Sequence, residues 1–192
     1  MLTMVSTKRY VKYMVSLRCK TILKEELGKT DLTYYISPHG AIEFHDEDTQ
    51  AQLDKLNRNL LKSVLEQLDE NDSMLIDRII NTVIEVIHYS DQLPNLSFKE
   101  IIGKSLGSGN ESILEIFSDV KGVSIMQFII IQKIERVKEL LLYEDLSLAG
   151  IAEKLRYKNK HYLIAQFKKF TGLPPTYFMD IKKDRRSILN KA

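Results

Sequence analysis

The side chains with the clearest chemistry lie near the carboxyl end, where lysines and arginines accumulate. Residues 154–192 contain eleven Lys and Arg against two acidic residues, a net charge of +9, whereas the whole 192-residue chain carries only +2. Residues 1–96 and 97–153 carry net charges of −4 and −3. Positive charge gathered in one segment is what binding to nucleic-acid phosphates requires. The sequence therefore predicts that nucleic acid contacts mainly this last segment.

Two similar blocks of sequence must position these charges. The first block is SFKEIIGKSLGSGNESILEIFSDVKGVS, and the second is SLAGIAEKLRYKNKHYLIAQFKKFTGLP. Each predicts a capped short helix, a tight turn and a second helix that ends in F-x-x-x-x-G. Between the blocks, apolar residues at helical spacing predict a long helix over about 124–143. From Asp72 onward we thus expect an all-α domain of two helix-turn-helix units joined by a long linker helix.

The second block also predicts which side chains face outward. Seven residues are expected to pack where its two helices cross: Ile151, Ala152, Leu155, Tyr162, Leu163, Phe167 and Phe170. Five residues then remain for the outer face of the second helix: Asn159, Lys160, His161, Ile164 and Ala165. This face could read base edges, or it could be a solvated basic face without sequence readout.

Residues 72–186 resemble the DNA-binding domain of the AraC/XylS family of bacterial transcription regulators. The run IQKIERVKELLLYEDLSLAGIAEKLRY is similar to the family's linker helix and second helix-turn-helix, and residues 167–178, FKKFTGLPPTYF, resemble its most recognisable segment. In that family two recognition helices enter successive major-groove segments on one face of DNA. The resemblance implies base contacts from Lys160, His161, Ile164 and Ala165. It leaves Lys158, Lys168 and Lys169 as candidates for phosphate contacts.

Three departures from the family's pattern matter. Ala165 stands where the family often has arginine, so one bidentate pair with guanine cannot form. Arg156 occupies a turn position that is often glycine, and a side chain on left-handed backbone there costs about 1 kcal/mol. In the first block the outward positions are acidic or neutral: Glu111, Leu114, Glu115, Ser118 and Asp119. We therefore expect the first unit to bind DNA weakly or to be purely structural.

Residues 1–70 predict a small α+β domain with the order β-α-β-β-α, which would serve as a sensor or interaction domain. Residues 7–17 have the composition of a strand, and residues 19–27 predict a helix that Gly28 caps. Strands are expected over 32–37 and 41–45, joined by a turn at 38–40. Apolar residues from Leu53 to Leu68 predict an amphipathic helix over 49–68.

This order, with Met14-Val15-Ser16-Leu17-Arg18-Cys19 at the first strand-to-helix junction, is similar to the heavy-metal-associated ferredoxin-like domain. That domain binds soft metal ions through two thiolates of an M-x-C-x-x-C loop. Here Ser16 stands at the first thiol position, and a single thiolate makes a poor soft-metal site. The histidines at 39, 45 and 88 lack ligand spacing. The resemblance therefore implies a fold, and we predict no metal and no cofactor.

The sequence also argues against several function classes. It has no G-x-S-x-G, no H-E-x-x-H and no glycine-rich phosphate loop, so we expect no enzyme. A lone cysteine, Cys19, no uninterrupted apolar run at the start and no membrane span favour a cytoplasmic protein. The predicted function is a sequence-specific regulator whose partners are double-stranded DNA and, as a further candidate, RNA polymerase. The alternative is a protein-interaction module whose helix-turn-helix blocks no longer bind DNA.

Overall fold

The computed structural model describes residues 7–14, 16–44, 50–106 and 112–189. The chain divides into two compact units, residues 1–81 with 102–125 (unit 1) and residues 82–101 with 126–192 (unit 2). Each unit is therefore built from two separate segments of the chain.

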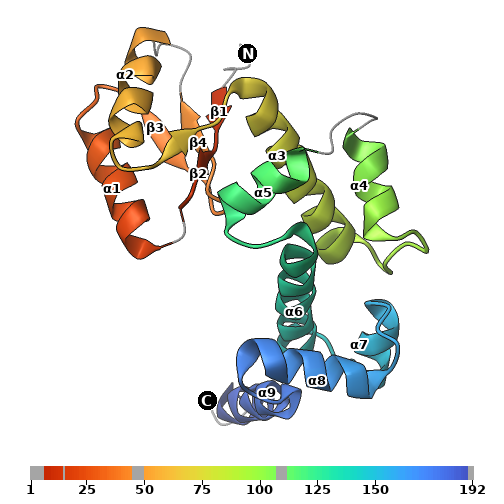
Figure 1. Cartoon of the computed structure of the whole chain (residues 1–192). Coiled ribbons are helices and arrows are strands. Elements are labelled where there is room, and N and C mark those ends of the chain that lie inside the picture. Colours follow the sequence, from red (N-terminus) through yellow and green to blue (C-terminus); the bar gives the residue numbers. More distant parts are fainter. Residues whose placement is uncertain (1–6, 15, 45–49, 107–111, 190–192) are drawn as a thin grey trace, which may run out of the picture. The chain divides into compact units, whose positions relative to one another are not determined.

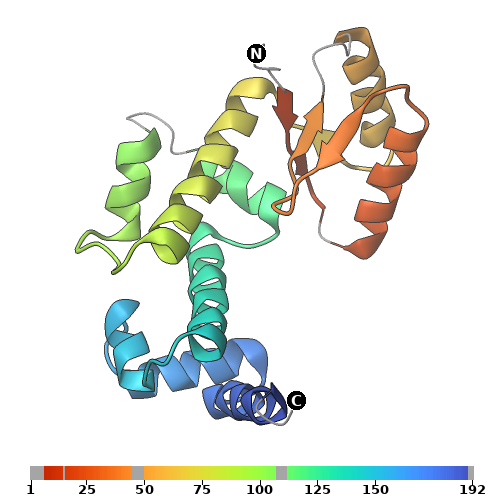
Figure 2. The ribbon, with the colours of Figure 1, turned by 180° about the vertical axis from the view of Figure 1, so that it is seen from behind.

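Unit 1 begins with a small α+β fold (Figures 1 and 2). Its elements, in chain order, are β1 (Thr7–Arg9), β2 (Val11–Lys12), α1 (Leu17–Gly28), β3 (Tyr34–Ile36), β4 (Ile42–Phe44), α2 (Gln50–Leu61) and β5 (Glu66–Gln67). Strand β4 lies between β1 and β3 and is antiparallel to both, while β2 pairs antiparallel with β5. The chain thus changes its strand partner between β1 and β2.

Tyr10 marks the point where the partner changes. Its backbone N–H donates to the Ser73 hydroxyl at 3.2 Å, and its carbonyl accepts from the Leu68 N–H at 2.8 Å. The strand prediction over 7–17 is therefore confirmed only to Lys12, because Leu17 already belongs to α1. The hairpin is confirmed, with Gly40 at φ 87° in the turn between β3 and β4.

The helix predicted over 49–68 is wrong beyond Leu61, where α2 ends. Val64 adopts φ 60°, and its N–H donates to the Leu61 carbonyl while the Leu65 N–H donates to that of Leu60. These two bonds form a Schellman motif, which usually has glycine at the left-handed position. The next residues form β5, so the order is β-β-α-β-β-α-β. Gly28 likewise is the last helical residue of α1, and Lys29 is the cap.

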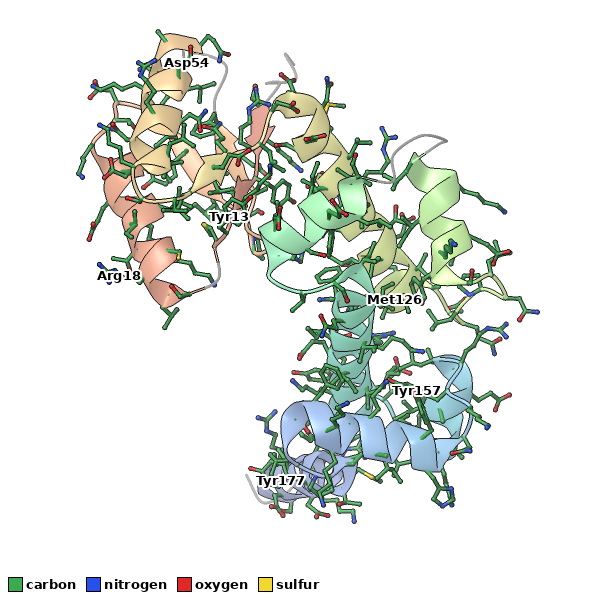
Figure 3. The ribbon with its side chains drawn as sticks, in the orientation of Figure 1. Tyr13, Arg18, Asp54, Met126, Tyr157 and Tyr177 are labelled. Carbon is green, nitrogen blue, oxygen red and sulfur yellow. The ribbon has the colours of Figure 1, made fainter. Side chains whose placement is uncertain are left out.

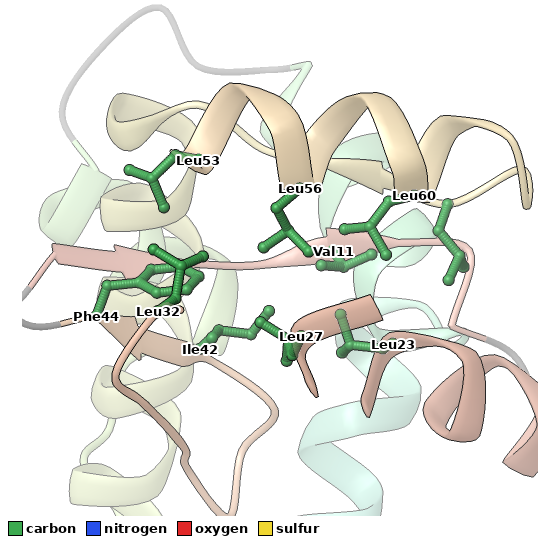
Figure 4. Packing of buried hydrophobic residues seen from close by; sticks show 10 residues of the cluster. Val11, Leu23, Leu27, Leu32, Ile42, Phe44, Leu53, Leu56 and Leu60 are labelled. Carbon is green, nitrogen blue, oxygen red and sulfur yellow. The ribbon is translucent and has the colours of Figure 1, made fainter. Parts of the chain in front are cut away.

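The core of this fold lies between the strands and the two helices α1 and α2 (Figure 4). Leu23 and Leu27 of α1 and Leu56 and Leu60 of α2 are at most 1% exposed. They pack in one apolar cluster with side chains from the strands, such as Phe44. The spacing of four residues on each helix places each pair on one face, as amphipathic helices require.

Helix α3 (Glu70–Ile84) adds polar contacts to the first strands. The Tyr10 hydroxyl donates to Asp77 at 3.1 Å, and Lys8 forms an ion pair with the same carboxylate at 3.3 Å. Burial, followed by the charge of Asp77, raises the pKa of Tyr10 above its usual value. Arg9 pairs with Glu70 at 3.4 Å. These contacts fix the start of α3 within unit 1.

The rest of the described chain is helical, as predicted. A π-helical turn (Glu85–Tyr89) extends α3, and five helices follow α4 (Phe98–Leu106): α5 (Ile113–Lys121), α6 (Ile125–Tyr143), α7 (Leu148–Lys154), α8 (Lys160–Thr171) and α9 (Pro175–Leu189). The capping box at α4 is confirmed, since the Ser97 N–H donates to the Glu100 carboxylate at 2.8 Å and the Glu100 N–H to the Ser97 hydroxyl at 3.2 Å.

We predict that Leu56→Ala lowers the free energy of unfolding by about 2–5 kcal/mol, because it leaves a cavity in the cluster of α1, α2 and the strands. Leu61→Ala, on the same helix but 53% exposed, is the matched control and should change it far less. Urea unfolding followed by circular dichroism measures both values. Equal losses for the two variants would contradict this placement of the core.

Candidate nucleic-acid interface

Local hydrogen bonds fix the start of α7 and both ends of α8. The Ser147 hydroxyl accepts from the Gly150 N–H at 3.1 Å at the start of α7, and the Asn159 side-chain oxygen accepts from the Tyr162 N–H at 2.9 Å at the start of α8. Gly172, at φ 75°, closes α8 by donating to the Lys168 carbonyl at 2.9 Å. The predicted cap of α7 at Ser147 and the predicted end of α8 at Gly172 are therefore confirmed, while the cap at Asn159 was not expected from the sequence.

The face on which α7 and α8 pack agrees with the prediction at five of seven positions. Five side chains are at most 3% exposed: Ile151, Ala152, Leu155, Leu163 and Phe167. Tyr162 and Phe170 are instead 54% and 40% exposed, so their predicted burial is wrong. Leu163 and Phe167 are four residues apart and define the buried stripe. The ring of Phe178 from α9 packs edge-on against Phe167 at 5.4 Å between centroids.

The opposite face of α8 and the two residues before the helix carry the residues that the sequence singled out. Six of the eight have exposed side chains that form no hydrogen bond or ion pair within the described chain: Lys158, Lys160, His161, Ala165, Lys168 and Lys169. Ile164 is half-buried. Asn159 is exposed, but its side-chain oxygen is already engaged in the cap. Tyr162, for which the spacing predicts a place in the core, is exposed as well.

Ion pairs divide the basic residues of the last segment into two groups. Lys154 pairs with Glu144, Lys183 with Asp180, and both Lys182 and Arg186 with Asp145. No ion pair within the described residues involves the lysines of the second group, which we call the lysine face: Lys158, Lys160, Lys168 and Lys169. Four of the eleven basic residues are thus engaged in ion pairs, and the lysine face carries positive charge that is open to a ligand.

The turn between α7 and α8 is held by two consecutive residues, of which Figure 3 labels the second, Tyr157. Arg156 lies on left-handed backbone at φ 50°, as the frequent glycine at this position in the family leads one to expect. Its guanidinium donates to the Leu93 carbonyl and to the Asn95 side-chain oxygen, the latter at 2.8 Å. The next residue, Tyr157, turns inward and is 9% exposed.

Tyr157 is stacked beneath a cation from α6. The Lys133 ammonium lies 4.3 Å from the centroid of the tyrosine ring, a distance typical of a cation–π contact. Burial lowers the pKa of Lys133 to about 8 and raises that of Tyr157 above its usual value. The turn, α6 and the segment at 93–95 are therefore packed against one another.

A chain of polar contacts runs along α6. Arg136 donates to Glu139 at 3.0 Å and pairs with Glu144 at 3.6 Å. His88 lies 3.2 Å from the Glu139 carboxylate through Nδ1, and Glu144 also pairs with Lys154 of α7. Arg136 is thus a support for the packing of α6 and α7, and its contacts point away from a role on the lysine face.

Helix α9 is fastened to the turn between α6 and α7. Asp145 accepts from Lys182 at 2.7 Å and from Arg186 at 2.9 Å. The hydrogen bonds from Arg186 and Lys182 lower the pKa of Asp145 to about 2. These bonds therefore persist at neutral pH and weaken only when the carboxylate is protonated in strong acid. No local sequence pattern indicates this arrangement, because the partners are 37 and 41 residues apart.

The first block ends as the second does but presents a different outer face. Phe117 is fully buried. Gly122 adopts φ 67°, and its N–H donates to the Ser118 carbonyl, just as the Gly172 N–H donates to the Lys168 carbonyl. Leu114 is 44% exposed and lines a shallow hollow with Glu115 and Asp119. Glu111 lies outside the described residues. The described outer face of α5 is thus apolar and acidic.

The segment similar to a soft-metal loop is occupied by a helix cap. The Ser16 hydroxyl accepts from the Cys19 N–H at 3.3 Å, and the hydroxyl lies 3.2 Å from the Cys19 sulfur. Within the described residues no three His, Cys, Asp or Glu side chains are arranged to hold a metal ion. None of the described helices combines the length and hydrophobicity needed to cross a bilayer.

Comparison with known proteins assigns the carboxyl-terminal part. Residues 102–180 match the family described as a helix-turn-helix domain. Over 137 residues, 71% of this chain, the sequence is 25% identical to an uncharacterized HTH-type transcriptional regulator of Bacillus subtilis, YtdP. The aligned region spans only 17% of that relative's length.

Two solved structures are each similar to a little more than half of the chain. The C-terminal domain of AraT, a response regulator from Geobacillus stearothermophilus, is 21% identical and covers 56% of this chain and 84% of its own, with a TM-score of 0.48. The DNA-binding domain of AdpA, solved with a target DNA, is 18% identical and covers 58% of this chain and 96% of its own, also with a TM-score of 0.48.

The match over 102–180 and the caps and buried faces described above define the class of this part of the chain: it is a helix-turn-helix domain. It is a domain of the AraC type, which confirms the resemblance seen in the sequence.

We predict that Arg156→Ala lowers the free energy of unfolding by about 1–3 kcal/mol, because the bonds to Leu93 and Asn95 are removed while the left-handed backbone remains. Arg156→Gly should be more stable than Arg156→Ala by about 1 kcal/mol, because glycine adopts φ 50° without strain. Thermal and urea unfolding measure both variants. If the alanine variant equals the glycine variant, the turn stores no strain.

Proposed function

We propose that this chain is a DNA-binding regulator of transcription that reads the major groove mainly through α8. The observation that carries the proposal is the lysine face: four exposed lysines without internal ion pairs, within the described residues, on and beside one helix of an AraC-type domain. Such lysines are available to DNA phosphates, and releasing the counterions of those phosphates supplies binding free energy. The name of the Bacillus subtilis relative supports the same function.

The roles within the interface follow from position on α8. Lys160 and His161 lie in its first turn, and Ala165 follows His161 by four residues on the same face. We assign base-edge contacts to these three and to Ile164, whose half-buried side chain limits its reach. We assign phosphate contacts to Lys158, Lys168 and Lys169. Asn159 caps α8 and is proposed to lie next to the bases.

The first block should contribute little to affinity. Its described outer face offers Leu114, Glu115 and Asp119, and carboxylates near phosphate lower binding. Recognition therefore rests nearly alone on the second block. We retain the division into an amino-terminal sensor or interaction domain over 1–70 and a DNA-binding domain over 71–192, with α6 as the linker helix and RNA polymerase as a candidate partner.

The amino-terminal domain is proposed to have ferredoxin-like connectivity. If β1 and β2 count as one strand interrupted at Tyr10, the pairing of β5 with β2, of β1 with β4 and of β4 with β3 is the antiparallel order of that fold. The strand pairing supports this proposal, and the absence of a second thiol at Ser16 leaves the metal chemistry of the heavy-metal-associated family without support.

We predict that binding to random duplex DNA weakens steeply with salt, and that replacing both Lys168 and Lys169 by Ala flattens the log–log slope by about 0.9 for each phosphate that the variant no longer neutralises. Lys24→Ala with Lys55→Ala, two exposed lysines of α1 and α2, is the control with the same change of charge. Fluorescence anisotropy between low and moderate salt gives the slopes. No measurable binding of the unaltered chain would favour the protein-interaction alternative.

We predict that Lys160→Ala or His161→Ala relaxes the base preference at one or two positions and costs about 1–3 kcal/mol on the preferred site. That site is first obtained by selection from genomic fragments, and binding to it and to unrelated duplex is then compared. Lys158→Ala, which removes a proposed phosphate contact, should weaken both DNAs alike and is the control. Losses of equal size on both DNAs for Lys160→Ala would remove that residue from the sequence-reading group.

A further inference from the structure

A small cavity lies within unit 1, between the α+β fold and helix α5. Its volume is about 170 Å³, and its walls come from the first strands, α1, the turn between β3 and β4, and the end of α5. Tyr10, Val11 and Val120 give it apolar sides. A volume below the range of about 300–1,000 Å³ for drug-sized ligands admits only a small molecule.

Two lysines from different helices meet at this cavity. Lys20 comes from α1 and Lys121 from α5, and none of the residues lining the cavity, all of them described, is Asp or Glu. The Lys121 ammonium donates to the His39 carbonyl at 2.9 Å. This bond fixes the ammonium group at the wall of the cavity.

The electrostatics of the cavity favour an anionic ligand. Burial, followed by the positive charge of Lys20, lowers the pKa of Lys121. Burial and the neighbouring positive charge both disfavour the charged form of Lys121. An anion placed between the two side chains would cancel the repulsion between Lys20 and Lys121. Its binding would therefore also keep Lys121 protonated.

We propose that this cavity binds a small organic anion whose charged group bridges Lys20 and Lys121 and whose short apolar body lies against Tyr10, Val11 and Val120. The anion joins α1 to α5. Helix α5 already contacts the same fold through the Tyr13 N–H, which donates to the Asp119 carbonyl at 2.8 Å. Because α5 belongs to the region 102–180, the ligand would act on the helix-turn-helix domain directly. Binding itself does not depend on the proposed function.

The test is isothermal titration of the whole chain with sodium butyrate, and separately with inorganic phosphate, at constant ionic strength without DNA. We expect one butyrate per chain and an affinity at least tenfold weaker in Lys20→Met and in Lys121→Met. Lys24→Met, an exposed lysine on α1 that does not line the cavity, is the matched control and should bind as the unaltered chain does. Lys20 is exposed, so Lys20→Met keeps the test valid if Lys121→Met fails to fold.

Stronger binding of phosphate than of butyrate, with the same dependence on Lys20, would keep the site and identify a phosphate ester as its ligand class. The proposal is overturned if neither probe binds the unaltered chain, or if Lys24→Met loses as much affinity as Lys20→Met. Displacement of bound butyrate by short duplex DNA would instead assign the two lysines to DNA phosphates. The butyrate and phosphate titrations contain no DNA, so their outcomes are independent of the test of the proposed function.

Discussion

The turn at Arg156 and Tyr157 is the constraint on which the proposed interface depends. Helix α8 must bury Leu163 and Phe167 while its opposite face stays exposed. The direction in which the chain leaves α7 determines which face of α8 is buried and which is exposed. Left-handed backbone at Arg156 directs Tyr157 into the interior, where Lys133 stacks on its ring. A side chain at this position costs conformational energy. The guanidinium offsets that cost by binding the segment at Leu93 and Asn95.

The same constraint sorts the positive charge. Cations that hold the helices together are paired with carboxylates away from the lysine face, as Lys182 and Arg186 are with Asp145. Exposed pairs of this kind contribute little stability individually, but two donors on one carboxylate also fix the direction of α9. The lysines of the lysine face have no such task within the described chain. Net charge alone therefore overstates the binding surface, and the ion pairs show which part of it is available.

Local features of this fold could be predicted from the sequence, and distant contacts could not. The caps at Ser97 and Ser147 and the left-handed glycines at 122 and 172 follow from residue types within one helical turn. The end of α2 was missed because a valine, Val64, occupies the left-handed position where glycine is the usual signal. The partners of Arg156 are 61 and 63 residues away, and contacts over such distances leave no periodic pattern in the sequence. Tyr162 was misplaced because composition does not distinguish a buried aromatic side chain from an exposed one beside it.

The two similar blocks share the residues that fold them and differ in those that could contact DNA. Phe117 and Phe167 are both fully buried, and both second helices end on a glycine whose N–H binds the carbonyl four residues earlier. The outer faces differ: α8 presents lysines, whereas the described face of α5 presents Leu114 and Glu115. Burial of an aromatic anchor and a glycine cap are requirements of the fold and say nothing about a ligand. Helix α5 also packs on the α+β fold and lines its cavity, so its buried face is tied to that fold whatever its outer face contacts.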